Sequence, residues 1–281
     1  MSLSIFNFRI NKYLKLILYF LISFFLLNLF IFFLPPDYSK DIYNDAISYS
    51  DDKPKEGHFV KNIKVVAFGD SKATQASTNF FNEPTLSFAA PNNTIIFSKF
   101  IFDKFRENPL FKPKYVILYI GPNNFNKNGI FPKRDFAIRR LASYTQLLEM
   151  AKIGDGLEYA LDGLISKLIP IYGRRIEIRH PSNLWKLIIK KKHDNNKIPG
   201  MFHVKNVKKN QVTRDFKLDR NYALIYERSV YNEFALSILH TKYLENMIED
   251  IIKLGATPII VQLPVDKKIR ILRDKLVKNE F

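Results

Sequence analysis

The chain contains no cysteine among its 281 residues. It therefore forms no disulfide, offers no thiolate to a metal, and has neither a cysteine nucleophile nor an N-terminal cysteine for lipid attachment. Phosphate-binding and dinucleotide-binding loop patterns are also missing, and no His, Asp and Glu residues have the spacing of metal ligands. We therefore expect neither a metal nor another cofactor.

Acidic residues are scarce compared with basic ones. The chain has 44 Lys and Arg against 27 Asp and Glu, a net charge of +17. This excess favours anionic partners such as phospholipid or a phosphorylated envelope polymer. Nucleic acid is anionic too, but no recognition motif is present and we do not expect it as a partner.

One long hydrophobic run stands near the N-terminus. From Leu16 to Leu34 there are nineteen residues without a charge, and Pro35 and Pro36 follow. At about 1.5 Å per residue the run spans roughly 28 Å, close to the hydrocarbon thickness of a bilayer. A cleaved signal peptide is the alternative, but its apolar region is shorter and ends in small residues. We predict a retained transmembrane helix that anchors the chain in a membrane.

The basic residues around this run predict its orientation. Arg9, Lys12 and Lys15 precede it, whereas Lys40 alone follows closely. The positive-inside rule then places the N-terminus in the cytoplasm and the main domain outside it. We divide the chain into a cytoplasmic N-terminus (1–15), an anchor (16–36), an acidic linker (37–60, with a short helix near 42–48) and one domain (61–281).

Short apolar runs alternate with helical patterns in that domain. We predict strands over 63–68, 85–90, 115–120 and 258–263, and helices over 94–105, 141–164, 229–253 and near the C-terminus. Continuous apolar strands separated by helices are typical of parallel strands buried on both faces. The pattern predicts an α/β fold with three layers, α/β/α.

Residues 126–228 interrupt this alternation and form a predicted insertion. Residues 173–228 hold fifteen Lys or Arg against five Asp or Glu, and thus ten of the seventeen net charges. A solvated surface is the plain interpretation, and attraction to anionic lipid or envelope polymer is the functional one.

Polar residues follow three of the predicted strands, where open parallel sheets bind their ligands. They are Gly69-Asp70-Ser71, Pro91-Asn92-Asn93 and Gly121-Pro122-Asn123-Asn124. Ser71 is expected at the start of a helix, whose N–H groups favour a developing negative charge. The same residues also suit helix caps and plain turns.

These stretches resemble blocks of the SGNH/GDSL hydrolase superfamily. Val65-Val66-Ala67-Phe68-Gly69-Asp70-Ser71 is similar to its first block, and Gly121-Pro122-Asn123-Asn124 to its Gly-x-Asn-Asp block. The resemblance covers residues 60–125 and 229–266. It implies a flavodoxin-like α/β/α fold and cleavage or transfer of ester-linked acyl groups, in anchored members on envelope polysaccharides.

The resemblance also implies roles for individual residues. Ser71 would be the nucleophile, and the N–H groups of Ser71 and Asn92 with the Asn123 side chain would hold the oxyanion. Asn92 stands where the family usually has glycine, and Asn124 where it has aspartate.

The family's Asp-x-x-His block is missing after the last predicted strand. His58 precedes the first strand, and the predicted helix puts His240 about 16 Å from the strand ends. His180, His193 and His203 lie in the insertion without a clear acidic partner. Two hypotheses follow: an anchored esterase or O-acyltransferase acting on envelope glycan or lipid, or an inactive or truncated scaffold that binds anionic envelope components or a protein.

Overall fold

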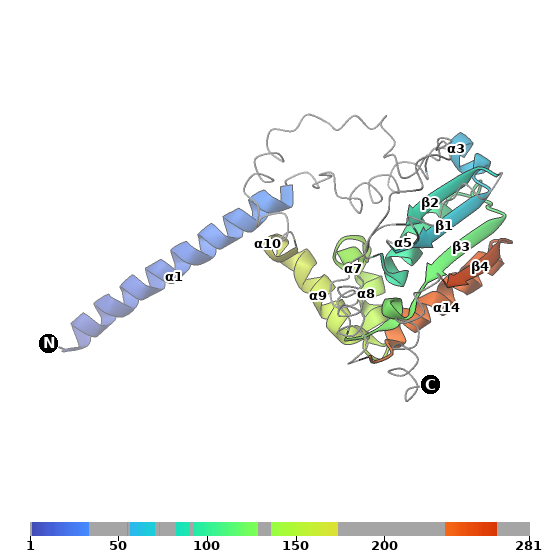
Figure 1. The fold of residues 1–281 in the computed structure, drawn as a ribbon. Coiled ribbons are helices and arrows are strands. Elements are labelled where there is room, and N and C mark those ends of the chain that lie inside the picture. The colour runs from blue at the N-terminus through green and yellow to red at the C-terminus, as the bar shows by residue number, and fades with distance from the viewer. Residues whose placement is uncertain are drawn as a thin grey trace, which may run out of the picture.

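The computed structural model of the chain describes residues 2–33, 55, 57–70, 73, 83–89, 93–128, 136–173 and 234–262. The predicted helix near 42–48, the basic residues 174–228 and the predicted C-terminal helix lie outside these ranges. Figure 1 shows a long helix, a group of shorter helices and a sheet, arranged in that order across the molecule.

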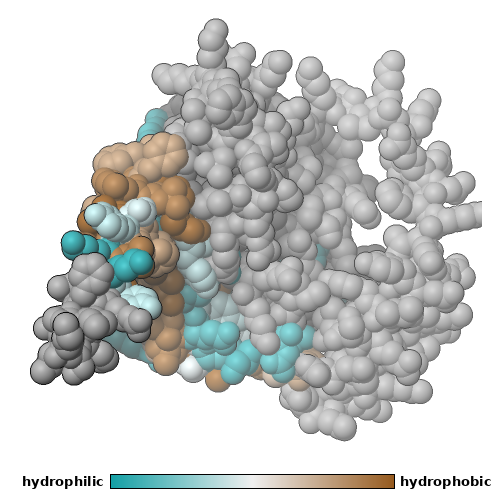
Figure 2. Space-filling view, turned by 90° about the vertical axis from the view of Figure 1, so that its left-hand side faces the viewer, coloured by the Kyte–Doolittle hydropathy of each residue, from teal (hydrophilic) through white to brown (hydrophobic). Residues whose placement is uncertain are grey.

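The long helix, α1 (Ser2–Phe33), carries the predicted anchor. Its stretch Lys12–Phe33, 22 residues, is long and apolar enough to cross a membrane. Within this stretch Ile31 is the only buried residue. Figure 2 views the molecule from the side that carries α1 and shows hydrophobic side chains gathered in one band.

The sheet consists of four parallel strands in the order β2-β1-β3-β4. The strands are β1 (Val65–Gly69), β2 (Thr85–Ala89), β3 (Tyr115–Ile120) and β4 (Thr257–Gln262). Each begins and ends within two residues of its predicted bounds. The predicted α/β class with a parallel sheet is therefore confirmed.

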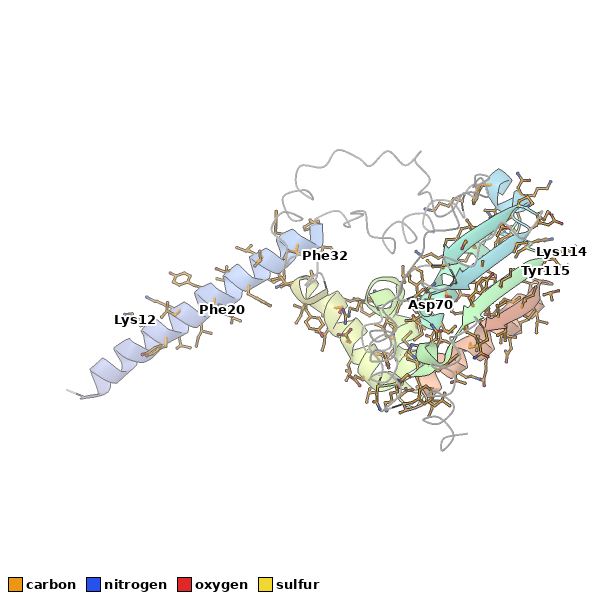
Figure 3. All side chains as sticks on the ribbon, in the orientation of Figure 1. Lys12, Phe20, Phe32, Asp70, Lys114 and Tyr115 are labelled. Atoms are coloured by element: carbon orange, nitrogen blue, oxygen red, sulfur yellow. The ribbon has the colours of Figure 1, made fainter. Side chains whose placement is uncertain are left out.

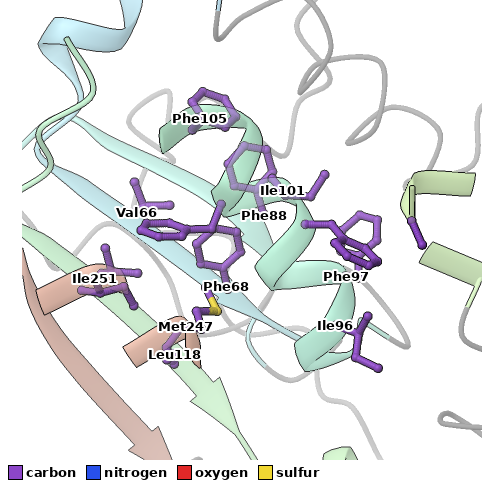
Figure 4. Close-up of a cluster of buried hydrophobic side chains, with 14 of the residues drawn as sticks. Val66, Phe68, Phe88, Ile96, Phe97, Ile101, Phe105, Leu118, Met247 and Ile251 are labelled. Atoms are coloured by element: carbon purple, nitrogen blue, oxygen red, sulfur yellow. The ribbon is translucent and has the colours of Figure 1, made fainter. Parts of the chain in front are cut away.

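Two helices cover one face of the sheet: α5 (Ile95–Arg106) and α14 (Ile238–Lys253). Alternate residues of β1, such as Val66 and Phe68, point into the same core as Phe105 of α5 and Ile251 of α14 (Figure 4). Phe68 stacks on Phe88 of β2 with 5.5 Å between ring centroids. The opposite residues, Val65 and Ala67 among them, belong to a second, smaller cluster that includes Ala73.

An ion-pair ring joins α5 to α14. Lys99 lies 2.5 Å from Asp103 and 3.1 Å from Asp250. Arg106 completes the ring, 3.3 Å from Asp103 and 2.5 Å from Asp250. Because the Lys99 side chain is only 9% exposed, these carboxylates offset the cost of removing its ammonium group from water.

Shorter helices follow the sheet's third strand. They are η3 (Pro122–Phe125), α7 (Phe136–Leu141), α8 (Tyr144–Ala151), α9 (Gly156–Leu168) and α10 (Pro170–Gly173), and α3 (Gly57–Asn62) precedes β1. The single helix predicted over 141–164 is wrong. Ser143 starts α8 with a capping box to Gln146, and Gly154 at a φ of 20° separates α8 from α9.

The helix predicted over 229–253 also begins later than expected. Ser237 caps α14 and accepts a hydrogen bond from the His240 N–H. Its own N–H donates to the Phe125 carbonyl at 2.7 Å, and Leu236 bridges to Asn126. Residues 235–237 therefore run beside the chain that leaves β3, which excludes them from the helix.

Candidate functional site at the carboxyl ends of the strands

The carboxyl ends of all four strands lie at one edge of the sheet, because the strands are parallel. Gly69, the last residue of β1, pairs with Ala89 of β2 on one side and Tyr119 of β3 on the other. Figure 3 shows Asp70 at the end of the sheet that faces α7–α9, and Lys114 and Tyr115 at the opposite end. The chain reverses its direction of strand addition between β1 and β3, the position where such sheets bind ligands.

Gly69 is required by a close approach of the chain on both sides. A Cβ at this position would lie 2.4 Å from the Ala73 Cβ and 2.7 Å from the Tyr119 Cβ. The Ala73 N–H donates to the Asp70 carbonyl at 3.0 Å, which closes a turn immediately after the strand. The predicted nucleophile Ser71 lies in sequence within this turn, outside the described residues.

Two buried asparagines connect the ends of β2 and β3. Asn124 accepts a hydrogen bond from the Gly121 N–H at 2.8 Å and donates to the Asn93 carbonyl at 3.3 Å. The Asn93 side chain in turn donates to the Phe88 carbonyl at 3.0 Å and accepts from Ser98 at 3.4 Å. The loops after β2 and β3 are thus held together by amide side chains.

Neither residue's role was predictable from the sequence. In the sequence Asn93 is part of a turn, and Asn124 stands where the resembled family usually has aspartate. Polar residues directly after two buried strands were the available indication. Their pairing depended on which strands are close in space.

Of the predicted site residues, Asn92 also lies outside the described residues. Asn123 belongs to η3, directly after β3, and its side chain is not among those described. The structure does bring together the segments that adjoin all three predicted residues: Asp70, Asn93 and Gly121 each lie at the carboxyl edge of the sheet.

His240 is closer to this edge than predicted. As the third residue of α14, it lies next to Ser237, whose N–H is bonded to η3. Its ring is fully buried at 0% exposure, with Nδ1 2.8 Å from the Ser237 hydroxyl. Tyr159 of α9 packs against it edge-on, 5.6 Å between centroids. The ring therefore holds the hydroxyl of the capping Ser237 and fills the core between α9 and α14.

Tyr119 of β3 belongs to the small cluster that also includes Ala73. It lies opposite Gly69, and its residue is 9% exposed. Burial raises the pKa of the Tyr119 phenol above its ordinary value of 10.0. The phenol is therefore protonated at neutral pH.

Across the ranges that the structure describes, no three His, Asp or Glu side chains come together to hold a metal ion. Comparisons with protein-family models, with curated proteins and with solved structures found no match for this chain.

Proposed function

We propose that the chain is a membrane-anchored protein of the SGNH type that cleaves or transfers an ester-linked acyl group at Ser71. Lys12–Phe33 of α1 crosses the membrane, the N-terminus is cytoplasmic, and the α/β domain lies outside the cytoplasm. The length and exposure of this stretch support the anchor, and the three basic residues before it support the orientation.

The domain has the flavodoxin-like three-layer arrangement. The strand order β2-β1-β3-β4 supports it, because the flavodoxin type of doubly wound sheet begins with the same order. Ala73 packs against the sheet's second face, with Val65, Ala67 and Ile117.

The tight turn at Gly69, at the end of β1, is the single observation that carries the proposed chemistry. The Gly-Asp-Ser sequence stands at the end of β1, beside the reversal point of the sheet, in a turn too tight for a Cβ at Gly69. A solvent-accessible serine at such a turn is well placed to attack a carbonyl carbon, because backbone N–H groups of the turn can stabilise the oxyanion.

The reaction proceeds through an acyl-enzyme. The Ser71 oxygen bonds to the ester carbonyl carbon, its proton passes to a base, and the alcohol leaves with a proton. The N–H groups of Ser71 and Asn92 and the Asn123 amide hold the negative oxygen. Water, or a hydroxyl of an envelope glycan or lipid, then takes the acyl group. His180, His193 and His203 are the candidate bases by sequence.

A fluorophosphonate probe tests this chemistry on the full chain in detergent. Labelling that is lost in Ser71→Ala and kept in Ser143→Ala, an exposed serine outside the proposed site, is expected. If neither the native chain nor Ser143→Ala reacts under conditions that label a control serine esterase, the enzymatic proposal is wrong.

The burial of His240 favours a second candidate function. It is the one histidine whose side chain the structure describes, and it is enclosed in the core. A scaffold without a working base would instead bind anionic envelope polymer or lipid through its basic segment, 174–228.

Binding is tested with the full chain in neutral vesicles. Fluorescent polyphosphate should cosediment with them, less so as salt rises, and neutral dextran should not. Equal retention of the two polymers would contradict the electrostatic proposal. Alkaline phosphatase fused after Phe281 tests the orientation, because the fused enzyme is active only outside the cytoplasm.

A further inference from the structure

Helix α9 exposes a row of large apolar side chains on the side away from the core. Leu157, Leu161, Ile165 and Leu168 are 54%, 48%, 40% and 65% exposed. Their spacing of four, four and three residues places them along one side of the helix. Other positions, including Tyr159 and Gly163, face the core. A surface helix of a globular domain normally has one apolar side, and α9 has two.

The neighbouring helix α8 extends this surface. Tyr144 and Leu148, one turn apart, are 57% and 67% exposed. The Lys167 ammonium lies 5.7 Å from the centroid of the Tyr144 ring, so the two helices meet there. Burial lowers the pKa of Lys167, consistent with its apolar surroundings. We call the six exposed residues of both helices the α8–α9 apolar face: Tyr144, Leu148, Leu157, Leu161, Ile165 and Leu168.

This face is connected to the end of α1. Helix α10 follows α9 and packs against α1, where the Ile171 N–H donates to the Asn28 side chain at 3.2 Å. Ile31 is 3% exposed. The Tyr172 hydroxyl donates to Asp162 of α9 at 2.6 Å, which holds α10 to α9.

The contact between Ile171 and Asn28 shows how far the start of α10 lies below the end of α1. Asn28 stands five residues before Phe33, the last residue of α1, or about 7.5 Å at 1.5 Å per residue. Phe32 and Phe33 are 63% and 74% exposed. If α1 crosses the membrane, lipid therefore covers these apolar side chains up to the end of the helix. The contact therefore lies below the level at which α1 leaves the lipid.

The C-terminal end of α9 lies next to α10 and this contact, and α9 does not run alongside α1. In Figure 1 the two helices diverge from α10, α1 to one side and α9 toward the sheet. A helix that lies in the membrane surface typically sinks its apolar side 5–10 Å, and about 7.5 Å falls within that range.

We propose that the α8–α9 apolar face lies in the interfacial layer of the membrane that α1 crosses, with lipid as its partner. This rests on the proposed anchoring by α1. The domain would then be held against the lipid surface in one orientation. Because Asp70 lies at the end of the sheet that faces α7–α9 (Figure 3), the carboxyl edge of the sheet would be on the membrane side.

The absence of cysteine allows a direct test with single labels. We would prepare Leu161→Cys and Leu148→Cys in the full chain, attach an environment-sensitive fluorophore, and reconstitute each into phosphatidylcholine vesicles. Ser23→Cys reports on α1. Ile252→Cys is the matched control, because Ile252 is an apolar residue at 58% exposure near the Lys114 end of the sheet.

The labels at 161 and 148 should be quenched by spin-labelled lipid, with a Stern–Volmer constant for iodide several-fold below that of 252. If iodide quenches the labels at 161 and 148 as strongly as the label at 252, the α8–α9 apolar face is not in the membrane. Quenching of the label at 23 by lipid in the same experiment would show that α1 is still in the membrane. If lipid does not quench 23, the anchoring itself is wrong. If 161 is shielded from both iodide and lipid, a second copy of the chain covers the face, which also overturns the proposal.

Discussion

Gly69 and Tyr119 are paired residues of β1 and β3, and their backbones approach so closely that a Cβ on Gly69 would lie 2.7 Å from the Tyr119 Cβ. The same hypothetical Cβ would lie 2.4 Å from Ala73 on the chain that leaves the strand. Neither neighbour is the end of a flexible side chain, so the backbone would have to move.

Gly69→Ala should therefore destabilise the domain by about 1–3 kcal/mol, the usual cost of overpacking a core. Chemical unfolding of the full chain in detergent measures the change. Gly121→Ala is the matched control, because a Cβ there meets only Asn124 Oδ1 at 3.9 Å. An equal effect of both substitutions would show that the close contact at Gly69 carries no special cost.

Asn124→Asp should be destabilising at neutral pH, although aspartate is usual at the matching position of the resembled family. The carboxylate keeps the acceptor for the Gly121 N–H but replaces the amide that donates to the Asn93 carbonyl. We expect a loss of about 1–3 kcal/mol from the unsatisfied carbonyl and the buried charge.

The pH dependence distinguishes this variant from Asn124→Ala. Burial should raise the pKa of the new carboxyl group, so the loss is present above the folded pKa and shrinks as the pH falls through it. The protonated carboxyl group can donate again. For Asn124→Ala the loss should not vary in this way; parallel pH profiles would contradict the proposed hydrogen bond.

Asp250→Asn should destabilise the packing of α14 on α5 by about 3 kcal/mol, as for breaking a buried ion pair. The variant leaves Lys99, 9% exposed in its side chain, with one carboxylate fewer. Glu249→Gln, the next residue, is the control: its pair with Lys253 is exposed at 60% and 69%, and such pairs contribute about 0–1 kcal/mol. Similar losses for both would contradict a special role of the ring.

The difference in stability between the native chain and Asp250→Asn should depend on pH. At Asp250, desolvation raises the pKa, but the hydrogen bonds and charges of Lys99 and Arg106 outweigh it and hold the pKa below 3.8. The stabilisation is therefore present above pH 3.8 and lost as the pH falls below that value toward the folded pKa. At Asp103 burial dominates and raises the pKa, so its contribution has the opposite sign. The difference between native and Asp250→Asn should be smallest in acid.

His240→Ala should cost about 2 kcal/mol or more, because it removes a buried ring from between α9 and α14. His240→Gln should cost less, since glutamine three residues after a capping serine suits a capping box. Thermal unfolding ranks the two variants. If Ser71 reacts with the probe, folded His240→Gln should react equally; loss of labelling there would make His240 the base.

The strands were predictable from local sequence, and their ends were not misplaced by more than two residues. Runs such as Tyr115–Ile120 are apolar on both sides and end in turn residues, so burial and boundary are both encoded locally. The start of α14 was not predictable in this way. The residues before Ile238 suit a helix by composition, but they are bonded to Phe125 and Asn126, which are more than a hundred positions away.

The sequence by itself determined the apolar helix near the N-terminus, the parallel α/β pattern and the polar residues at the strand ends, because each depends on neighbouring residues along the chain. Tertiary structure decided that Gly69 admits no Cβ, that Asn124 bonds to the loop after β2, and that His240 is enclosed. It also decided that the apolar row of α9 faces outward, beside the end of α1. These properties depend on which segments meet in space, and no local pattern of residues specifies that.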